Sequence, residues 1–206
     1  MQILSLFRKE KISPKDVEQS PLLKSVKIGN QVWMTSNLNV DHFRNGDIIP
    51  EARSDADWTK AGDERKAAWC YYNNNPENGE VYGKLYNKYA INDPRGLAPK
   101  KWHVPSEKEF QILIEKGTKD GNTLKEKGQG SEGGAGTNSS GFSALLAGYR
   151  DYHGWFIDLG SRTIFWSSTV NRPPYSANLT LMDRDGYISL YSDHARFGYS
   201  VRCIRD

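Results

Sequence analysis

Phe165-Trp166-Ser167-Ser168-Thr169 begins the most informative segment of the chain, and Val201-Arg202-Cys203-Ile204-Arg205 ends it. Both segments carry apolar residues that can anchor a strand, whereas the residues between them mix Tyr and Phe with Ser, Asp, Arg and His. Large amphipathic side chains among small polar ones are typical of antibody contact loops, because they give contact area at low entropic cost. We therefore expect a recognition surface held between two structural segments.

The length and composition of the chain favour one domain with an extension. The chain has 206 residues, the upper end of one ordinary domain when ~150 residues is the usual size. Hydrophobic residues make up 37% of the sequence, charged residues 26% and aromatic residues 12%. A core is therefore available, but Trp and Tyr must fill much of it, which favours a loop-rich fold.

Charge and hydropathy argue against two classes of partner. The formal net charge is +3, and Lys and Arg are dispersed along the chain, so we expect no nucleic-acid partner. No apolar run approaches the ~20 residues that span a bilayer, so we expect no membrane span. The apolar segment from Met1 to Phe7 is too short for a secretory signal, and its basic residues follow it instead of preceding it.

The sequence lacks the common motifs of catalysis, metal binding and cofactor binding. Cys70 and Cys203 are the only cysteines, which leaves one disulfide or two free thiols, with two buried free thiols favoured. The four histidines, at positions 42, 103, 153 and 194, do not have the spacing of zinc ligands or of a triad. Neither a Gly-x-Ser-x-Gly elbow nor a Gly-rich loop leading into a helix is present. We therefore expect a non-enzymatic protein with no cofactor and no metal site.

Residues 1–25 and residues 26–206 are expected to differ in structure. The first segment has alternating charges, two prolines and no sustained hydrophobic period, so it predicts an arm that packs late or extends to a partner. The domain then begins with residues 26–28, a Gly29-Asn30 turn and residues 31–34. This pattern predicts a β-hairpin, because Gly and Asn tolerate the positive φ of tight turns.

Three segments of the first half predict helices. Residues 54–58 offer capping side chains before a short helical turn. A spacing of three and four residues predicts one buried helix face, made by Tyr82, Leu85, Tyr86 and Tyr89. Ser106-Glu107-Lys108-Glu109 matches a capping box, and the helix that it starts is expected to end at Gly117.

The second half of the chain is expected to be mostly β. The Gly-rich segment 128–141 cannot bury apolar surface and predicts a surface loop or a disordered tip. Short strand-like runs separated by Gly or Pro follow it. They cover residues 142–147, 155–158, 163–167, 177–182, 187–191 and 199–204. Helices early and strands late predict an α+β fold with an antiparallel sheet.

A series of short motifs, in order along residues 26–206, resembles one known family. The motifs are Ile28-Gly29-Asn30-Gln31-Val32-Trp33-Met34 with Asn37-Leu38-Asn39, Tyr82-Gly83-Lys84-Leu85-Tyr86-Asn87, Trp102-His103-Val104-Pro105-Ser106, Ser140-Gly141-Phe142-Ser143-Ala144, Phe165-Trp166-Ser167-Ser168 and Ser200-Val201-Arg202-Cys203. Together they resemble the Fibrobacter succinogenes major paralogous domain. That resemblance implies a C-type-lectin-like fold, with short helices early and an antiparallel β-rich second half whose late strands and loops display a ligand surface.

One position departs from the family pattern. Many members have a Cys shortly before the Trp-His-Val-Pro motif, whereas this chain has Gly96-Leu97-Ala98-Pro99-Lys100-Lys101 there. A disulfide from that position to Cys203 is therefore impossible, which weakens the inference of an oxidised, extracellular fold.

The tail, about residues 170–199, resembles the variable region of proteins diversified by retroelements, in which adenine-directed mutagenesis rewrites Asn-type codons. The resemblance implies a binding surface that varies while the fold persists, displayed on a virion or cell surface, with a protein ligand or receptor favoured over a sugar. The expected contact residues all belong to the amino-acid types that such mutagenesis produces. They are Tyr175, Asn178, Thr180, Arg184, Asp185, Tyr187, Ser189, Tyr191, Ser192, Asp193, His194 and Phe197.

The expected contact residues divide by role. Three tyrosines, at 175, 187 and 191, would be apolar anchors. Four charged or titratable residues, Arg184, Asp185, Asp193 and His194, would set charge specificity. The small side chains of Ser189 and Ser192 would allow close approach of the ligand.

Other interpretations stay open. A carbohydrate or cell-wall adhesion module would share the fold, although residues 76–78 and 91–93 only partly resemble the calcium ligands of sugar-binding lectins. Formylglycine-generating enzymes have a related fold and reactive cysteines, a role that Cys70 and Cys203 would have to fill. The tyrosines could also be cross-strand pairs of an ordinary sheet, in a structural subunit that assembles through its N-terminal arm.

Overall fold

The computed structural model describes residues 23–206, so the expected N-terminal arm lies outside the described residues except for its last three. The α-helices are α1 (Asp55–Asp63), α2 (Pro76–Tyr82), α3 (Lys88–Ile91) and α4 (Glu107–Ile112). Short 3₁₀ turns occupy Tyr72–Asn74, Gly121–Thr123 and Glu132–Gly134, and a π-helical turn occupies Leu113–Gly117. The strands are β1 (Ser25–Ile28), β2 (Gln31–Met34), β3 (Trp69–Cys70), β4 (Leu85–Tyr86), β5 (Trp102–His103), β6 (Ala147–Arg150), β7 (Phe156–Leu159), β8 (Arg162–Arg172), β9 (Tyr175–Met182), β10 (Ile188–His194) and β11 (Ile204–Arg205). The described chain therefore has the mixed α+β composition that the sequence predicts.

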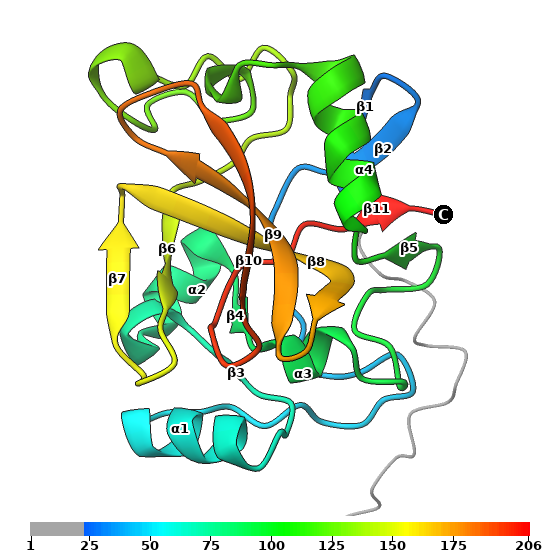
Figure 1. The fold of residues 1–206 in the computed structure, drawn as a ribbon, viewed down its shortest axis with the longest axis vertical. Helices are drawn as coiled ribbons and strands as arrows, with labels where there is room; N and C mark the ends of the chain where they lie inside the picture. The colour runs from blue at the N-terminus through cyan, green and yellow to red at the C-terminus, as the bar shows by residue number, and fades with distance from the viewer. Residues whose placement is uncertain (1–22) are drawn as a thin grey trace, which may run out of the picture.

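The strands form three sheets, and the largest belongs to the second half of the chain (Figure 1). Its order is β10-β9-β8-β6-β7, and its pairs are antiparallel except for one parallel contact between β6 and β8. A second sheet has the order β1-β2-β11-β5, and β3 pairs with β4. The predicted antiparallel character of the second half is thus confirmed.

The hairpin and two of the helix starts form as predicted. β1 pairs with β2 across the Gly29-Asn30 turn, where Gly29 has a φ of 59°. Ser54 caps α1 by accepting a hydrogen bond from the Asp57 amide. Ser106 and Glu109 form the complete capping box of α4, whose helical path continues through the π-helical turn to Gly117.

The predicted helix face through residues 82–89 is wrong. α2 ends at Tyr82, where Gly83 adopts a φ of 73°. Leu85 and Tyr86 then form strand β4 against β3, and Asn87 starts the separate helix α3 by capping it. Leu85 and Tyr86 are buried in successive strand positions. The helical spacing of the four aromatic and aliphatic residues is therefore a coincidence, because they belong to three short elements, α2, β4 and α3.

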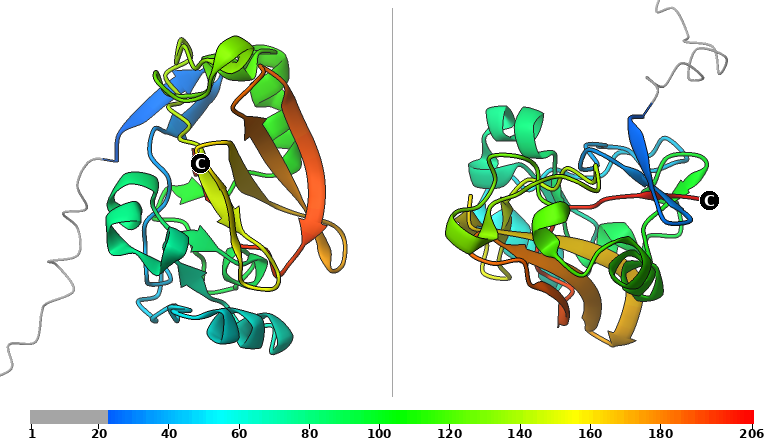
Figure 2. Two further views of the ribbon diagram at one scale, coloured as in Figure 1. Left: turned by 90° about the vertical axis from the view of Figure 1, so that its left-hand side faces the viewer. Right: turned by 90° about the horizontal axis from the view of Figure 1, so that it is seen from above.

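Both faces of the large sheet are covered, and this decides which late residues can reach solvent. On one face, α4 and the β1–β2 hairpin pack their apolar side chains against β8 and β9, as Trp33 and Phe110 do against Phe165 and Leu179. On the other face, Ile164 and Trp166 of β8 pack in one cluster with Tyr199 and Val201, whose segment pairs with β8 through the bridge between Phe165 and Ser200. Figure 2 shows β10 and the β6–β7 hairpin at opposite margins of the sheet, which leaves the margins more exposed than the centre.

Several strand bounds differ from the sequence-based ones because part of the chain is buried without pairing as a strand. The run predicted over 142–147 becomes a strand only at Ala147, and the run over 199–204 is a strand only from Ile204. The predicted residues that lie outside these strands pass through the core and make only single β-bridges, such as those of Tyr199 with Tyr86 and of Ser200 with Phe165. Among residues 23–206, none of the helices has the length and apolarity that a membrane crossing requires.

Candidate ligand-binding surface

Strand β10 lies at the edge of the large sheet and carries much of the predicted contact set. It pairs with β9 from Ile188 opposite Leu181 to His194 opposite Tyr175. Within the described residues, the main chain of 188–193 makes no hydrogen bond to any segment other than β9. An edge strand of this kind offers unpaired N–H and C=O groups to a ligand.

Six of the twelve predicted contact residues are exposed. Tyr175 is 47% exposed, Tyr187 67% and Tyr191 57%. The exposed set, called the β10 surface below, consists of Tyr175, Arg184, Asp185, Tyr187, Tyr191 and Ser192. Strand alternation and cross-strand pairing place Tyr191 on the sheet face that carries Asn178, and Ser192 on the face that carries Tyr175. The β10 surface therefore wraps around the free edge of the sheet.

Three predicted contact residues, Asn178, Thr180 and Ser189, are buried instead. Their side chains are 0%, 5% and 8% exposed. Asn178 and Thr180 lie on β9, which is one strand in from the edge and is covered on both faces. The sequence pattern suggested polar residues facing solvent, but polar residues on a sheet covered on both sides can be buried when they hydrogen-bond to one another. The structure therefore corrects these three positions from surface to interior.

Three further predicted residues, Asp193, His194 and Phe197, are half-buried. The Asp193 carboxylate accepts hydrogen bonds from Asn178 Nδ2 and from the Tyr199 hydroxyl, both at 2.8 Å. The His194 ring packs edge-on against Tyr175, with 5.8 Å between ring centroids. Burial, and next the charge of Arg196, lower the pKa of His194 below its usual value, which favours a neutral imidazole.

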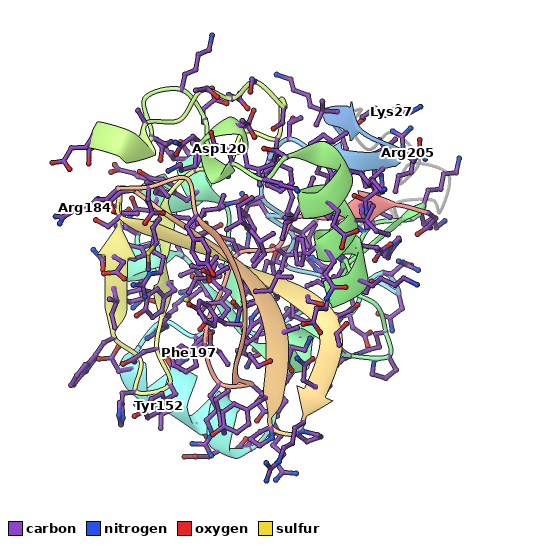
Figure 3. All side chains as sticks on the ribbon, turned by 45° about the horizontal axis from the view of Figure 1, so that its top comes forward. Lys27, Asp120, Tyr152, Arg184, Phe197 and Arg205 are labelled. Carbon is purple, nitrogen blue, oxygen red and sulfur yellow. The ribbon has the colours of Figure 1, made fainter. Side chains whose placement is uncertain are left out.

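The turn after β9, residues 183–187, is anchored from beneath. The Lys125 ammonium donates to the carbonyls of Met182 and Asp185 at 2.6 and 2.9 Å, and its side chain is fully buried. The Gly-rich segment 128–141 packs under the same turn, because a Cβ on Gly134 would lie 2.0 Å from the Asp183 carbonyl oxygen. Arg184 points outward from this turn (Figure 3). The predicted surface loop thus forms a packed support for part of the β10 surface.

An aromatic loop between β6 and β7 was missed by the sequence analysis. It presents Tyr152, His153 and Trp155, all exposed, with Trp155 at 63%. The Tyr152 ring lies 5.6 Å from the Phe197 ring, and both lie on one side of the molecule in Figure 3. The signal in the sequence was Tyr152-His153-Gly154-Trp155, a cluster of rings around a glycine, but it precedes the stretch that resembles a variable region.

Buried polar contacts hold this aromatic loop in place. Asp151 accepts hydrogen bonds from the amides of His153 and Trp155, both at 2.9 Å. Arg150, which is fully buried, donates to the Gly154 carbonyl at 2.9 Å and pairs with Asp55 on α1 at 3.0 Å. The exposed rings therefore stand on a loop with a defined main-chain path.

The two thiols do not resemble reactive cysteines. Cys70 and Cys203 are unpaired with each other and each is 0% exposed. Burial raises the pKa of each thiol to about 12, although Arg150 beside Cys70 and Arg202 beside Cys203 lower it somewhat. Reactive thiols need an accessible, electropositive setting. In residues 23–206, no cluster of three or more His, Cys, Asp or Glu side chains is arranged to hold a metal ion.

One comparison with known proteins identifies the family of the chain. A family model described as the Fibrobacter succinogenes major domain matches residues 26–205. The chain belongs to this family. No curated protein and no solved structure matches it.

Motifs of the Fibrobacter succinogenes major domain lie mainly in the core of this chain. Trp33, Phe142, Trp166 and Cys203, one from each of four quoted motifs, are each 0% exposed. The β10 surface falls between the last two of these motifs. The residues that mark the family therefore build the frame, and the exposed tyrosines are carried by it.

Proposed function

We propose that this member of the Fibrobacter succinogenes major domain family is a non-enzymatic ligand-binding protein that uses the β10 surface to contact a protein ligand. The main support is the exposure of Tyr175, Tyr187 and Tyr191 around a free strand edge. Exposed tyrosines supply large contact areas with little loss of rotamer freedom. The unpaired main chain of β10 adds donors and acceptors that suit an extended segment of a protein partner.

The proposal includes a surface that can change in sequence without loss of the fold. Exposed substitutions usually alter stability by less than ~0.5 kcal/mol, whereas core substitutions cost several times as much. The six β10-surface residues are exposed, whereas the half-buried Asp193 holds a separate hydrogen-bond network with the buried residues Asn178 and Tyr199. This separation suits a C-type-lectin-like receptor-binding protein, displayed on a virion or cell surface and diversified by a retroelement.

Two displayed libraries test the binding function. One randomises the six β10-surface positions, and the other randomises the covered positions Asn178, Thr180, Ser189 and Asp193. We expect most members of the first library to resist protease and to yield binders against a panel of unrelated proteins, while most members of the second unfold. Equal loss of protease resistance in both libraries, or a folded first library without binders, would overturn the proposal.

The origin of the variation has a separate test in the genome. A retroelement requires a nearby reverse transcriptase gene and an adenine-rich template copy of the codons for about residues 170–199, as the resemblance implies. If both are missing, the diversification part of the proposal fails while the binding part stands.

The exposed ring of Trp155 favours one second candidate, a carbohydrate or cell-wall adhesion module. Its flat, exposed face beside Tyr152 and His153 would suit a sugar ring better than it would suit solvent. Glycan-array binding that Trp155→Ala abolishes and that Tyr191→Ala leaves intact would favour this candidate. Calcium dependence of that binding, measured with and without chelator, would establish whether a metal takes part.

A further inference from the structure

A pocket of about 360 Å³ opens beside the end of β10, where α3 meets the β8–β9 turn. Pockets of ~300–1,000 Å³ are the usual size for small ligands. Its walls include apolar surfaces from Tyr89, Val170 and Pro174. The pocket is therefore large enough for a small molecule with an apolar body.

The charged residues that line the pocket are all basic. They are Arg65, Lys88 and Arg196, joined by the titratable rings of His194 and Tyr89. A carboxylate is absent from the lining; Asp63, outside it, pairs with Arg196 Nη1 at 2.6 Å. Within the described residues, Arg65 has no ion-pair partner. This concentration of positive charge favours an anion.

Lys88 differs from the other buried lysines of the described chain. Lys84 Nζ donates to Asn39 Oδ1 at 2.7 Å and to the Tyr71 hydroxyl at 3.2 Å, and Lys125 Nζ donates to two carbonyls. Lys88 is only 2% exposed, and among the described residues its Nζ has the Ser167 carbonyl as its single hydrogen-bond acceptor, beside the Trp166 ring, whose centroid lies 5.6 Å away.

An ammonium has three donors, and a buried one that lacks acceptors is costly. Desolvation lowers the pKa of Lys88 to about 7, so part of the population is neutral near that pH. The amine of Lys88 would therefore gain from a further acceptor that carries negative charge.

We propose that this pocket is a binding site for a small organic carboxylate with an apolar or aromatic body. The carboxylate accepts hydrogen bonds from Lys88 and from the unpaired Arg65 guanidinium, and the body lies against Tyr89 and Pro174. The site is distinct from the β10 surface and does not rest on its proposed function. His194 connects the two, because it lines the pocket and packs against Tyr175.

Binding of benzoate, measured by isothermal titration calorimetry, tests the site, with benzamide as its neutral counterpart of the same shape. We expect benzoate to bind at least tenfold more tightly than benzamide at pH 6.5. Lys88→Met should weaken benzoate binding at least tenfold, while Lys108→Met, which removes an exposed lysine on α4, should leave it unchanged. Equal affinity for the two probes, or no effect of Lys88→Met in a folded variant, would overturn the proposal.

The pH dependence of benzoate binding gives a second readout, which can be measured on the wild-type protein and so does not depend on whether a variant folds. A carboxylate favours the charged amine, so the affinity of the wild type should fall as pH rises from 6.5 to 8.5. The groups that line the pocket with Lys88 are Arg65, Arg196, His194 and Tyr89. Since the pKa of His194 is lowered, this ring is mainly neutral over the same range. Lys88→Arg, whose charge is permanent, should flatten the profile, and an identical slope in this variant would contradict the assignment.

Discussion

The Tyr199 hydroxyl donates a hydrogen bond of 2.8 Å to the Asp193 carboxylate, which joins the end of β10 to the segment that pairs with β8. Asn178 Nδ2 donates to the same carboxylate oxygen at 2.8 Å, and Thr180 donates to Asn178 at 3.2 Å. Burial raises the pKa of Tyr199 well above its usual value, and the nearby charge of Asp193 adds to the effect, so the phenol stays a donor. Asp193 is therefore an internal acceptor, and its first role is to satisfy buried polar groups.

Asp193→Ala is expected to destabilise the protein by about 1–3 kcal/mol, because two buried donors would lose their charged acceptor. The neighbouring Ser192→Ala should cost less than ~0.5 kcal/mol, since Ser192 is exposed and its side chain accepts a single hydrogen bond from residues 23–206, donated by Asn171. Urea denaturation with unchanged m-values checks both. Equal midpoints for the two variants would show that the network contributes nothing to stability.

Local signals predicted those parts of the fold that depend on a few adjacent residues. The Gly29-Asn30 turn and the Ser106–Glu109 capping box form as expected because each is complete within a short segment. The helix face through Tyr82 and Tyr89 failed because a stripe with helical spacing cannot be distinguished from short elements buried on all sides. Tertiary packing, and in particular the pairing of β4 with β3, decided that segment.

For a related reason, the sequence predicted the exposed tyrosines of the candidate surface but not the burial of its polar residues. The exposure of Tyr187 and Tyr191 follows from the turn and the edge strand that carry them. Asn178 and Thr180 are buried in a network that reaches Tyr199 through the Asp193 carboxylate, and no local pattern reports contacts over that sequence separation. The aromatic loop at Tyr152 was missed because its link to Phe197 is still more remote in sequence.

Gly134→Ala is expected to destabilise the protein by about 1–3 kcal/mol and to displace the turn that carries Arg184 and Tyr187. The added Cβ would lie 2.0 Å from the Asp183 carbonyl oxygen and 2.4 Å from the Asp185 amide nitrogen, so the main chain must move. Gly133→Ala is the matched control, because its Cβ would meet only the Arg184 carbonyl oxygen at an ordinary 3.6 Å. Thermal unfolding compares the two, and a fall in stability as large in the control would refute the packing explanation.

His103 should couple stability to pH through two carboxylates. Burial lowers its pKa, but the hydrogen bonds that the ring donates to the carboxylates of Glu109 at 2.7 Å and Asp206 at 2.8 Å outweigh this, so the net pKa is raised. A raised folded-state pKa means that the stabilisation is complete below the unfolded value, ~6.5, and is lost as pH rises through the folded value. The stability difference between wild type and His103→Gln should therefore be larger at pH 5.5 than at pH 8.5 in urea denaturation.

The exposed His153 supplies the control for this prediction. It makes no side-chain hydrogen bond within residues 23–206, so His153→Gln should shift stability by less than ~0.5 kcal/mol at both pH values. A difference for His103→Gln that is independent of pH would mean that its two carboxylate contacts do not favour the charged ring.

Lys88→Met should make the protein more stable, and the gain should depend on pH in the opposite sense from that of an ion-paired lysine. The folded-state pKa of about 7 lies below the unfolded value of ~10.4, so between these values the unfolded chain binds more protons than the folded one. The stability of the wild type therefore rises with pH across this window, while Lys88→Met lacks this contribution. The gain from the substitution should be largest at pH 7 and below and should shrink toward pH 10, as measured by urea denaturation in carboxylate-free buffer.

A constant gain across that range would show that the buried amine of Lys88 keeps an ordinary pKa. A loss of stability at pH 7 would show that the charge of this amine is already satisfied by the protein.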